Sequence, residues 1–360
     1  MNPSWQNIHK SFRLNGNSYP SDALKEVAYS LVKEGMDYEK PIGDFLLDWC
    51  SDKISLEVQT SGSTGIPKKI VLQKSQMLNS AMATGQYFGL KPDDSALLCL
   101  PVTSIAGKMM LVRAMVLGLQ LDYVKPSSQP LNKISKGYDF SAMVPLQAEK
   151  SIEQLEGIKT LLLGGAPVSF SLEKNLKDIP SNIYVTYGMT ETITHIAARQ
   201  IRPKVLVDFE LLPHIKISQD ERKCLIIDAP NISDNPVVTN DIVELTSETS
   251  FKWLGRYDNV INSGGIKLIP EQIEAKLSSI ITYRFFVAGI PDKTLGQKLV
   301  LIVEGKPDKE KSIMASIKDK NVLGKFEIPK NVIFVKEFIE TKTAKVHREK
   351  TLALLKSTLP

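Results

Sequence analysis

The densest group of residues that could do chemistry is a run of Ser, Thr and Gly that ends in lysine. Glycines let the backbone approach an anion closely, hydroxyl and main-chain N–H groups donate to phosphate oxygens, and a lysine supplies the opposite charge. The spacing is not that of a P-loop, and a Ser/Thr/Gly-rich turn is by itself also typical of a solvated loop. We interpret the run as a phosphate clamp made by Thr60, Ser61, Gly62, Ser63, Thr64, Gly65 and Lys68.

A second group of residues follows a short apolar segment, 184–187, which is expected to be a strand. Gly188, Met189, Thr190 and Glu191 come next. Open α/β sheets bind ligands just beyond the ends of such strands, and a carboxylate beside a phosphate site suits Mg²⁺. We therefore predict that Glu191 is a magnesium ligand; the alternative is a turn with a solvated glutamate.

Three weaker signals accompany these two. Thr239-Asn240-Asp241 is expected to form a turn. Asp241 and Arg256 are candidates for contacts with ribose, because carboxylates commonly accept hydrogen bonds from ribose hydroxyls. The stretch 341–348, which contains Lys345, is basic, and such a run is also typical of a solvated face.

The elements that would position these groups indicate an α/β protein. From residue 95 onward, uniformly apolar segments alternate with amphipathic ones, as expected for a mostly parallel sheet covered by helices. After residues 184–187 the pattern changes to shorter β-like segments, which predict an antiparallel β subdomain. Apolar residues flank Asn262-Ser263-Gly264-Gly265 and predict a hairpin, and a helix should start at Pro270. We expect a large domain over residues 1–256 and a small α+β domain over residues 257–360.

Composition limits the possible functions. The 360 residues are 42% hydrophobic and 24% charged, and the net charge of +5 is spread along the chain, so no nucleic-acid surface is indicated. Three separated cysteines favour a reducing compartment over a zinc or disulfide framework. The start lacks the layout of a signal peptide, and the most apolar window, 109–121, is too short for a membrane span. We expect a cytoplasmic protein, whose oligomeric state the sequence does not indicate.

Taken in order, these motifs resemble the acyl-adenylate-forming superfamily of acyl-CoA synthetases, adenylation domains and luciferases. The resemblance runs from Thr60 to Arg348, about four fifths of the chain. It implies an enzyme in which a small carboxylic acid attacks the α-phosphorus of ATP to give acyl-AMP and pyrophosphate. A thiol, commonly that of coenzyme A, then displaces AMP. The implied cofactors are ATP, Mg²⁺ and coenzyme A, and the implied small domain is mobile.

The resemblance also implies a role for each matching residue. Thr60 to Lys68 would cover the β- and γ-phosphates, and Lys345 would stabilise the transferring phosphate. Glu191 would bind Mg²⁺, Asp241 and Arg256 the ribose, and Asp258 would be the hinge. The nucleotide would also contact residues at the strand ends, which are Gly164, Gly165, Ala166, Pro167, Tyr187, Gly188, Met189 and Thr190. The thiol tunnel would border Gly264 and Gly265.

Three features depart from the family pattern. The region before Thr60 is shorter than in full-length relatives, and Asn240 and Ala344 replace usual glycines. Asn tolerates the left-handed backbone conformation and Ala removes only loop freedom, so activity is expected.

A chain of this length most resembles the short o-succinylbenzoate-CoA ligases of menaquinone biosynthesis, whose substrate is an aromatic keto-diacid. The segment from Pro101 to Ser104 lacks the histidine of many relatives. Ser104 and Lys108 are candidates for the acid pocket, with Lys108 holding the distal carboxylate, and Arg113 is expected to form a structural ion pair. The alternatives are a ligase for another small acid, with coenzyme A or a carrier protein as acceptor, and a non-catalytic adenylate-binding homologue.

Overall fold

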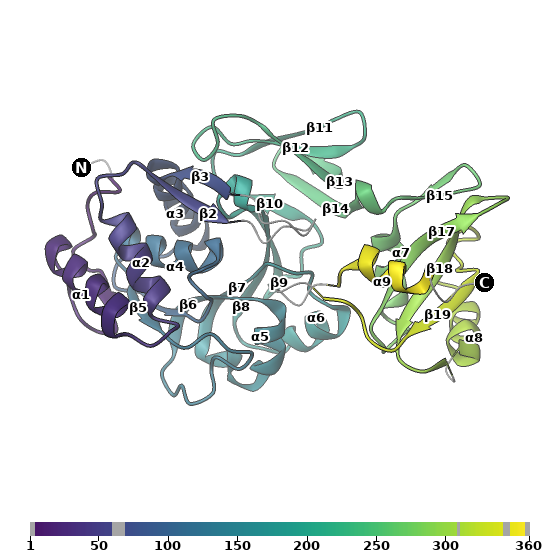
Figure 1. Ribbon diagram of the computed structural model, residues 1–360, viewed down its shortest axis with the longest axis horizontal. Coiled ribbons are helices and arrows are strands. Elements are labelled where there is room, and N and C mark those ends of the chain that lie inside the picture. Colours follow the sequence, from purple (N-terminus) through teal and green to yellow (C-terminus); the bar gives the residue numbers. More distant parts are fainter. Residues whose placement is uncertain (1–3, 60–68, 308–309, 341–345, 357–360) are drawn as a thin grey trace.

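The structure is a computed structural model, and it describes residues 4–59, 69–307, 310–340 and 346–356. Two sheets dominate it, a large one with helices around it and a smaller one that carries the C-terminal helices (Figure 1). The prediction of an α/β protein with a large mostly parallel part, a β subdomain and a small α+β part is confirmed. Among the described residues, no helix is long and apolar enough to cross a membrane.

The large sheet has twelve strands in the order β1-β5-β4-β6-β7-β8-β9-β10-β14-β13-β12-β11. The first six in this order are parallel to one another, and every pairing from β8–β9 onward is antiparallel. Their bounds are β1 Arg13–Leu14, β4 Ser95–Leu98, β5 Gln120–Tyr123, β6 Tyr138–Met143, β7 Ile158–Leu163, β8 Asn182–Gly188, β9 His195–Arg202, β10 Phe209–Leu211, β11 Lys216–Gln219, β12 Cys224–Asp228, β13 Val237–Ser247 and β14 Ser250–Arg256.

Helices cover both faces of the parallel half, which explains the uninterrupted apolar runs in its central strands β4 and β7. In β4, Leu97 and Leu98 enter different hydrophobic cores, and in β7 Leu162 separates from Leu161 and Leu163 in the same way. One core includes residues of α1 Ser21–Glu34, α2 Lys40–Trp49, α3 Lys74–Phe88 and α4 Ile105–Leu117; the other includes residues of α5 Pro145–Lys150 and α6 Phe170–Leu176.

The region before the phosphate clamp forms a compact addition to the large sheet. Helices α1 and α2 pack against each other, and β1 pairs with the edge strand β5. Lys74 is buried at the start of α3, where its Nζ donates to the carbonyl oxygens of Trp49 and Ser51 and lies 4.4 Å from the ring centroid of Trp5. Lys74 therefore ties the end of α2 and the N-terminal segment to the rest of the large part.

The clamp residues lie outside the described residues. The two strands that flank them, β2 Ser55–Gln59 and β3 Lys69–Gln73, pair antiparallel from Gln59 with Lys69 to Ser55 with Gln73.

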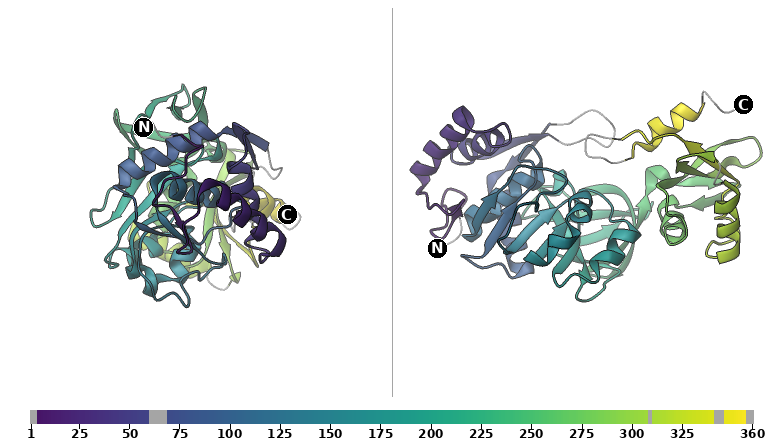
Figure 2. Two further views of the ribbon diagram at one scale, coloured as in Figure 1. Left: turned by 90° about the vertical axis from the view of Figure 1, so that its left-hand side faces the viewer. Right: turned by 90° about the horizontal axis from the view of Figure 1, so that it is seen from below.

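The small sheet has the order β16-β15-β18-β17, with β19 paired to β18. Its strands are β15 Ile261–Ser263, β16 Ile266–Leu268, β17 Phe285–Asp292, β18 Gly296–Glu304 and β19 Asn331–Val335; its helices are α7 Pro270–Leu277, α8 Glu310–Lys320 and α9 Arg348–Lys356. Figure 2 shows this part at the opposite end of the molecule from α1 and α2. The chain passes from one sheet to the other through the 3₁₀ turn η3, Tyr257–Asn259.

The structure confirms the hairpin at Gly264-Gly265, which joins β15 and β16, and the helix that begins at Pro270. The predicted turn at Thr239-Asn240-Asp241 is wrong, because these residues lie inside β13. Asn240 is not among the residues with positive φ, so its tolerance of a left-handed backbone is not used. Any residue can adopt the extended backbone of a strand, so glycine is not required at position 240. The side-chain amide is what Asn240 contributes there.

Candidate functional site

The site is built where the parallel strands of the large sheet end. Strands β7 and β8 are neighbours, with Leu163 paired to Val185, so Gly164–Pro167 and Gly188–Thr190 leave the sheet side by side. A Cβ atom at Gly164 would lie 2.7 Å from Oγ1 of Thr186, and Gly165 is exposed with a φ of +79°. Gly164 is therefore required by its contact with Thr186, whereas the exposed backbone at Gly165 can be approached closely.

Glu191 is carried by a tightly bonded turn after β8. Any side chain at Gly188 would collide with the backbone of Thr194 and His195. The Oγ1 atom of Thr192 accepts from the backbone N–H of Met189 at 3.1 Å and lies 2.7 Å from the carbonyl oxygen of Thr194, to which it donates. This turn leaves the Glu191 side chain exposed, without a hydrogen bond or ion pair to the residues that the structure describes.

Asp241 is held by groups from two other strands. The hydroxyl of Tyr187, at the end of β8, donates to Oδ2 of Asp241 at 2.7 Å, and Nε1 of Trp253 donates to Oδ1 at 3.0 Å. Arg256, the cross-strand partner of Asp241, places Nη1 3.8 Å from Oδ1. Burial, then the charge of Asp241, raises the pKa of Tyr187, so its hydroxyl stays a proton donor at neutral pH. The carboxylate is thus fixed in one orientation beside the strand end that carries Glu191.

The turn η3 is bonded to both parts of the molecule. Asp258 accepts from Nη2 of Arg256 at 2.8 Å and from Nδ2 of Asn240 at 3.2 Å. The next residue, Asn259, donates to Glu271 of α7 at 2.5 Å. Asp258 is therefore attached to the large sheet and Asn259 to the small part.

Ser104 and Lys108 stand at the start of α4. Ser104 caps the helix, accepting from the backbone N–H of Gly107 at 3.2 Å and donating to the carbonyl oxygen of Pro101 at 2.7 Å. Lys108 turns toward α2, with Nζ 5.2 Å from the ring centroid of Phe45. Burial lowers the pKa of Lys108, opposed by the nearby carboxylates of α2.

Arg113 lies on another face of α4, and the expected ion pair is wrong for the residues that the structure describes. Its side chain is buried, with Nε 3.3 Å from Oγ1 of Thr84 and Nη2 3.2 Å from Oγ1 of Thr194. Burial lowers its pKa to about 10, which leaves it charged at neutral pH. His195, buried and 3.3 Å from Thr84, has a pKa lowered by burial and then by Arg113, so it is neutral.

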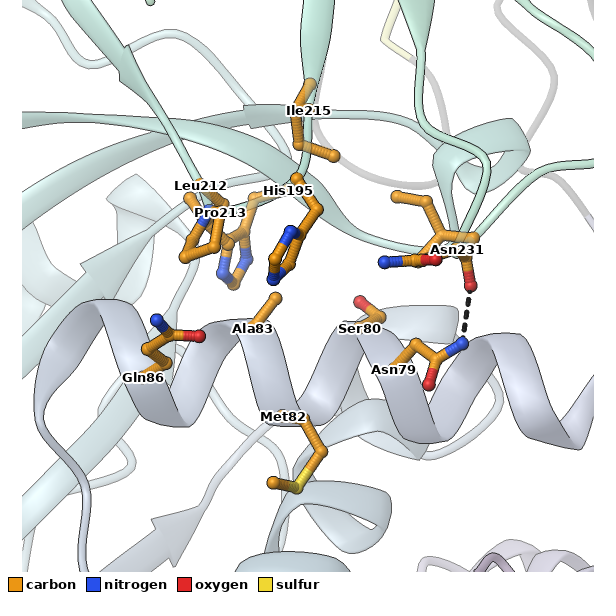
Figure 3. Close-up of a pocket in the computed structure, with 12 residues that line it drawn as sticks. Asn79, Ser80, Met82, Ala83, Gln86, His195, Leu212, Pro213, Ile215 and Asn231 are labelled. Carbon is orange, nitrogen blue, oxygen red and sulfur yellow. Dashed lines mark hydrogen bonds between the residues drawn. The ribbon is translucent and has the colours of Figure 1, made fainter. Parts of the chain in front are cut away.

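A cavity of about 230 Å³ lies between α3 and the segment Leu212–Ile215 (Figure 3). Ser80 of α3 and His195 point into it from opposite walls. Ser80 is hydrogen-bonded to Thr194 at 3.1 Å, so the wall of the cavity adjoins the hydroxyl groups around Arg113.

The remaining sequence-predicted residues are placed only in part. Gly264 and Gly265, with φ of +60° and +84°, form the exposed tip of the β15–β16 hairpin. Lys345 and the phosphate clamp lie outside the described residues.

Sequence reasoning missed Trp253 and Glu271. Trp253 lies on a strand with no motif of its own, and only the pairing of β13 with β14 brings its indole to Asp241. Glu271, in the first turn of α7, reads as an ordinary acidic residue at a helix start.

Comparisons with known proteins agree with this arrangement. The family described as AMP-binding enzyme matches residues 51–217. A crystal structure from Dyadobacter fermentans, described as an acyl-CoA synthetase (AMP-forming)/AMP-acid ligase II-like protein, is 36% identical, covers 92% of this chain and 98% of its own, and has a TM-score of 0.61.

Longer proteins are also similar. A 2-succinylbenzoate--CoA ligase of Bacillus cytotoxicus is 26% identical over 83% of this chain and 69% of its own length. The o-succinylbenzoate coenzyme A synthetase (MenE) of Bacillus subtilis, solved in complex with ATP and magnesium ion, shares the fold, with a TM-score of 0.71 at 20% identity over 94% of this chain and 83% of that one.

The order of the motifs, the strand-end geometry and these similarities lead to one assignment: the chain belongs to the AMP-binding, acyl-adenylate-forming family of ligases.

Proposed function

We propose that this protein is an acid–thiol ligase that activates an aromatic dicarboxylic acid of the o-succinylbenzoate type as its acyl-adenylate and transfers it to coenzyme A. The observation that carries the choice of a diacid is Arg113, a buried guanidinium with no carboxylate partner among the described residues. The curated relatives named 2-succinylbenzoate--CoA ligase support the same substrate class.

Among the residues that the structure describes, Arg113 has no carboxylate to neutralise its buried charge. A guanidinium has five N–H donors, and its partners here are two threonine hydroxyls and the sulfur of Met110 at 3.9 Å. A buried charge is costly unless it is paired. The second carboxylate of a diacid would supply the missing anion through a bidentate contact. Thr194 links Arg113 to the turn that carries Glu191. Nη2 of Arg113 bonds to the Thr194 hydroxyl, and the next residue, His195, pairs with Gly188 at the start of that turn.

The residues at the strand ends fit an adenosine nucleotide. The exposed backbone at Gly165, next to Gly164, can be approached by the adenine ring, and the fixed carboxylate of Asp241 can accept from ribose hydroxyls. Arg256 adds a positive charge next to Asp241. We assign nucleotide contacts to these residues and to Ala166, Pro167, Tyr187, Met189 and Thr190, which border the same edge.

Glu191 fits a magnesium ligand. Among the described residues, no group of three His, Cys, Asp or Glu side chains could hold a metal by itself. Mg²⁺ is commonly held by one or two carboxylates together with substrate phosphates. The exposed carboxylate of Glu191, which is not bonded to any residue in the described part of the chain, suits that arrangement. When bound, the ion would neutralise phosphate charge.

The remaining assignments complete the proposed reaction. The clamp from Thr60 to Lys68 binds the β- and γ-phosphates, and Lys345 offsets the charge that develops at the α-phosphate while the substrate carboxylate attacks. The small domain, residues 257–360, then turns about Asp258 and presents Gly264-Gly265 to the incoming thiol. Ser104 and Lys108 remain proposed acid-pocket residues at the start of α4.

The test is ATP–pyrophosphate exchange with o-succinylbenzoate and with the same keto acid lacking the ring carboxylate. Removing a charge-assisted contact of about 1.5–3 kcal/mol should cost about 10- to 150-fold. We expect that loss for Arg113→Met with the diacid only, and a smaller loss for Arg113→Lys.

Lys108→Ala in the same assay separates the two cations. Loss of the diacid preference in Lys108→Ala but not in Arg113→Met would move the distal carboxylate to Lys108. Exchange with other acids but not with o-succinylbenzoate would reject this substrate, and no exchange with any acid would reject the ligase.

A further inference from the structure

Glu271, in the first turn of α7, lies where the large sheet, the turn η3 and the small part meet. Its Oε1 accepts from Nδ2 of Asn259 in η3 at 2.5 Å. Its Oε2 packs against the backbone of Gly255 in β14, where a Cβ atom would collide with it. The side chain is only 10% exposed. One buried carboxylate of the small part therefore touches both the end of β14 and the turn that follows it.

This arrangement leaves two charged atoms buried and unbonded side by side. Among the described residues, neither Oε2 of Glu271 nor Nη1 of Arg348 has a hydrogen-bond partner, and both atoms are buried. Nη1 lies 3.9 Å from Oε1 of Glu271, which is longer than a hydrogen bond. Buried polar atoms are rarely left without partners, and charged ones are the most costly. An ion pair between these two residues is thus close to forming but not formed.

Arg348 uses only one of its two terminal nitrogens for a carboxylate here. Nη2 donates to Oε2 of Glu274 at 2.8 Å. Glu271 and Glu274 are three residues apart on α7, so both face the start of α9, where Arg348 is the first residue. A guanidinium presents its donors as a planar fork. Arg348 is therefore placed to bind Glu271 through Nη1 while it keeps Glu274.

Chain order decides which contact of Glu271 a turn at Asp258 would break. Gly255 precedes Asp258 and stays with the large sheet. Asn259 follows it and moves with α7, as does Arg348. A turn of the small part would therefore separate Glu271 from Gly255 and keep its bond from Asn259. Oε2 would then no longer be confined by β14, and the carboxylate could close the remaining gap to Nη1.

We infer that Glu271 is a positioning residue that couples the orientation of the small part to an ion pair. In the orientation described here, β14 holds its carboxylate away from Nη1 of Arg348; in the turned orientation, the two side chains bond. The inference rests on the proposed function in one respect, the turn about Asp258 between the two half-reactions. Glu271 stabilises the turned orientation, and Gly255 makes room for Glu271 in the present one.

The experiment compares two substitutions that should act in opposite directions. Glu271→Gln can still accept from Asn259 but removes both the unpaired buried charge and the later ion pair, so it favours the present orientation. Gly255→Ala places a Cβ atom against Glu271 and Ile269, so it disfavours that orientation.

Both half-reactions are measured on the full chain. Adenylation is followed as ATP–pyrophosphate exchange with the acid that gives the fastest exchange, and thiol transfer as thioester formation from preformed acyl-AMP and coenzyme A. We expect the ratio of the two rates to shift about threefold or more in Glu271→Gln, and by a similar factor in the opposite direction in Gly255→Ala. A ratio is used because a loss of folded protein lowers both rates equally.

Each substitution has a matched control in the small part. Glu327→Gln also converts a carboxylate bonded to α7 into an amide, but Glu327 pairs with Lys276, near the other end of that helix, at 2.7 Å. Gly305→Ala also strains a glycine of positive φ, +140° against +156° at Gly255, but its Cβ atom would meet no other atom within 4 Å. Both controls should leave the ratio unchanged.

A distance between the two parts gives a readout that does not need catalysis. Val205 and Val322 are exposed, one in each part, so cysteines placed there in a Cys50→Ser background can carry a fluorophore pair for single-molecule energy transfer. The other two cysteines are buried. We expect two distance populations whose proportions shift in opposite directions in Glu271→Gln and Gly255→Ala.

The outcomes separate this inference from the proposed function. Rate ratios that move in the same direction in both variants, or in neither, would overturn the role of Glu271, as would a single distance population that neither variant moves. Absence of both half-reactions in the unmodified protein with every acid would instead reject the ligase, and the label distances would still decide whether Glu271 responds to the orientation.

Discussion

The side-chain amide of Asn240 donates to both carboxylate oxygens of Asp258, at 3.2 and 3.3 Å. The same amide accepts from Nη1 of Arg222 at 2.9 Å, and the guanidinium of Arg222 lies 5.1 Å from the ring centroid of Tyr257. Two consecutive residues of η3 are thus held to the large sheet by side chains from outside the turn. A glycine at position 240 would provide neither the bonds to Asp258 nor the bond from Arg222.

Asn240→Gly should loosen η3 without disturbing either sheet. Because the bonds are largely exposed, their loss should cost about 1 kcal/mol, which corresponds to about a fivefold change in a local opening equilibrium. We expect amide hydrogen exchange of peptides spanning Tyr257–Val260 to accelerate by about that factor, with peptides of β17 and β18 as internal controls. Unchanged exchange across Tyr257–Val260 would show that the Asn240 amide does not hold the turn.

Asp258→Pro tests whether rotation at this residue is needed. Proline fixes φ near −65°, so thioester formation should fall by orders of magnitude, while pyrophosphate exchange survives if adenylation tolerates that φ. Asp258→Ala removes the same carboxylate and leaves φ free, so it is the matched control and should retain most ligase turnover. Normal turnover in Asp258→Pro would place the hinge elsewhere.

Tyr187→Phe should weaken ATP binding by freeing Oδ2 of Asp241. Loss of one hydrogen bond to a charged group, about 1.5–3 kcal/mol, predicts a KM for ATP raised about 10- to 150-fold. Tyr184→Phe is the control, because Tyr184 lies on the same strand but its hydroxyl accepts from Gln200 at 3.2 Å. Equal KM values in the two variants would argue that the orientation of Asp241 does not matter for the nucleotide.

His195 should make the protein less stable in weak acid. Burial and Arg113 hold its pKa well below 6.5 in the folded state, so below pH 6.5 the unfolded chain takes up a proton that the folded chain does not. The resulting loss of unfolding free energy approaches 1.36 kcal/mol per pH unit. We expect His195→Gln to lose less stability than the unmodified protein between pH 7 and 5.5 in urea titrations. Parallel profiles would mean that His195 takes up a proton as readily in the folded state as in the unfolded chain.

The central strands of the parallel half of the large sheet could be predicted from residue pattern because they are buried on both faces. Segments such as Leu161-Leu162-Leu163 are apolar without interruption only when helices cover both sides of the sheet. The hairpin at Gly264-Gly265 and the helix start at Pro270 could also be predicted, because turn geometry and the fixed φ of proline act within a few residues. The order of the motifs, read with these elements, was enough to identify the family.

Only the tertiary structure decided which side chains meet. The pattern around Thr239-Asn240-Asp241 favoured a turn, but pairing with β14 draws these residues into β13 and brings Trp253 to Asp241. An ion pair was expected for Arg113 because a lone buried guanidinium is unfavourable, yet α4 directs it at Thr84 and Thr194. Local sequence determines which conformation a segment prefers, whereas these contacts join residues up to 81 positions apart, as between Arg113 and Thr194, and depend on how strands and helices pack.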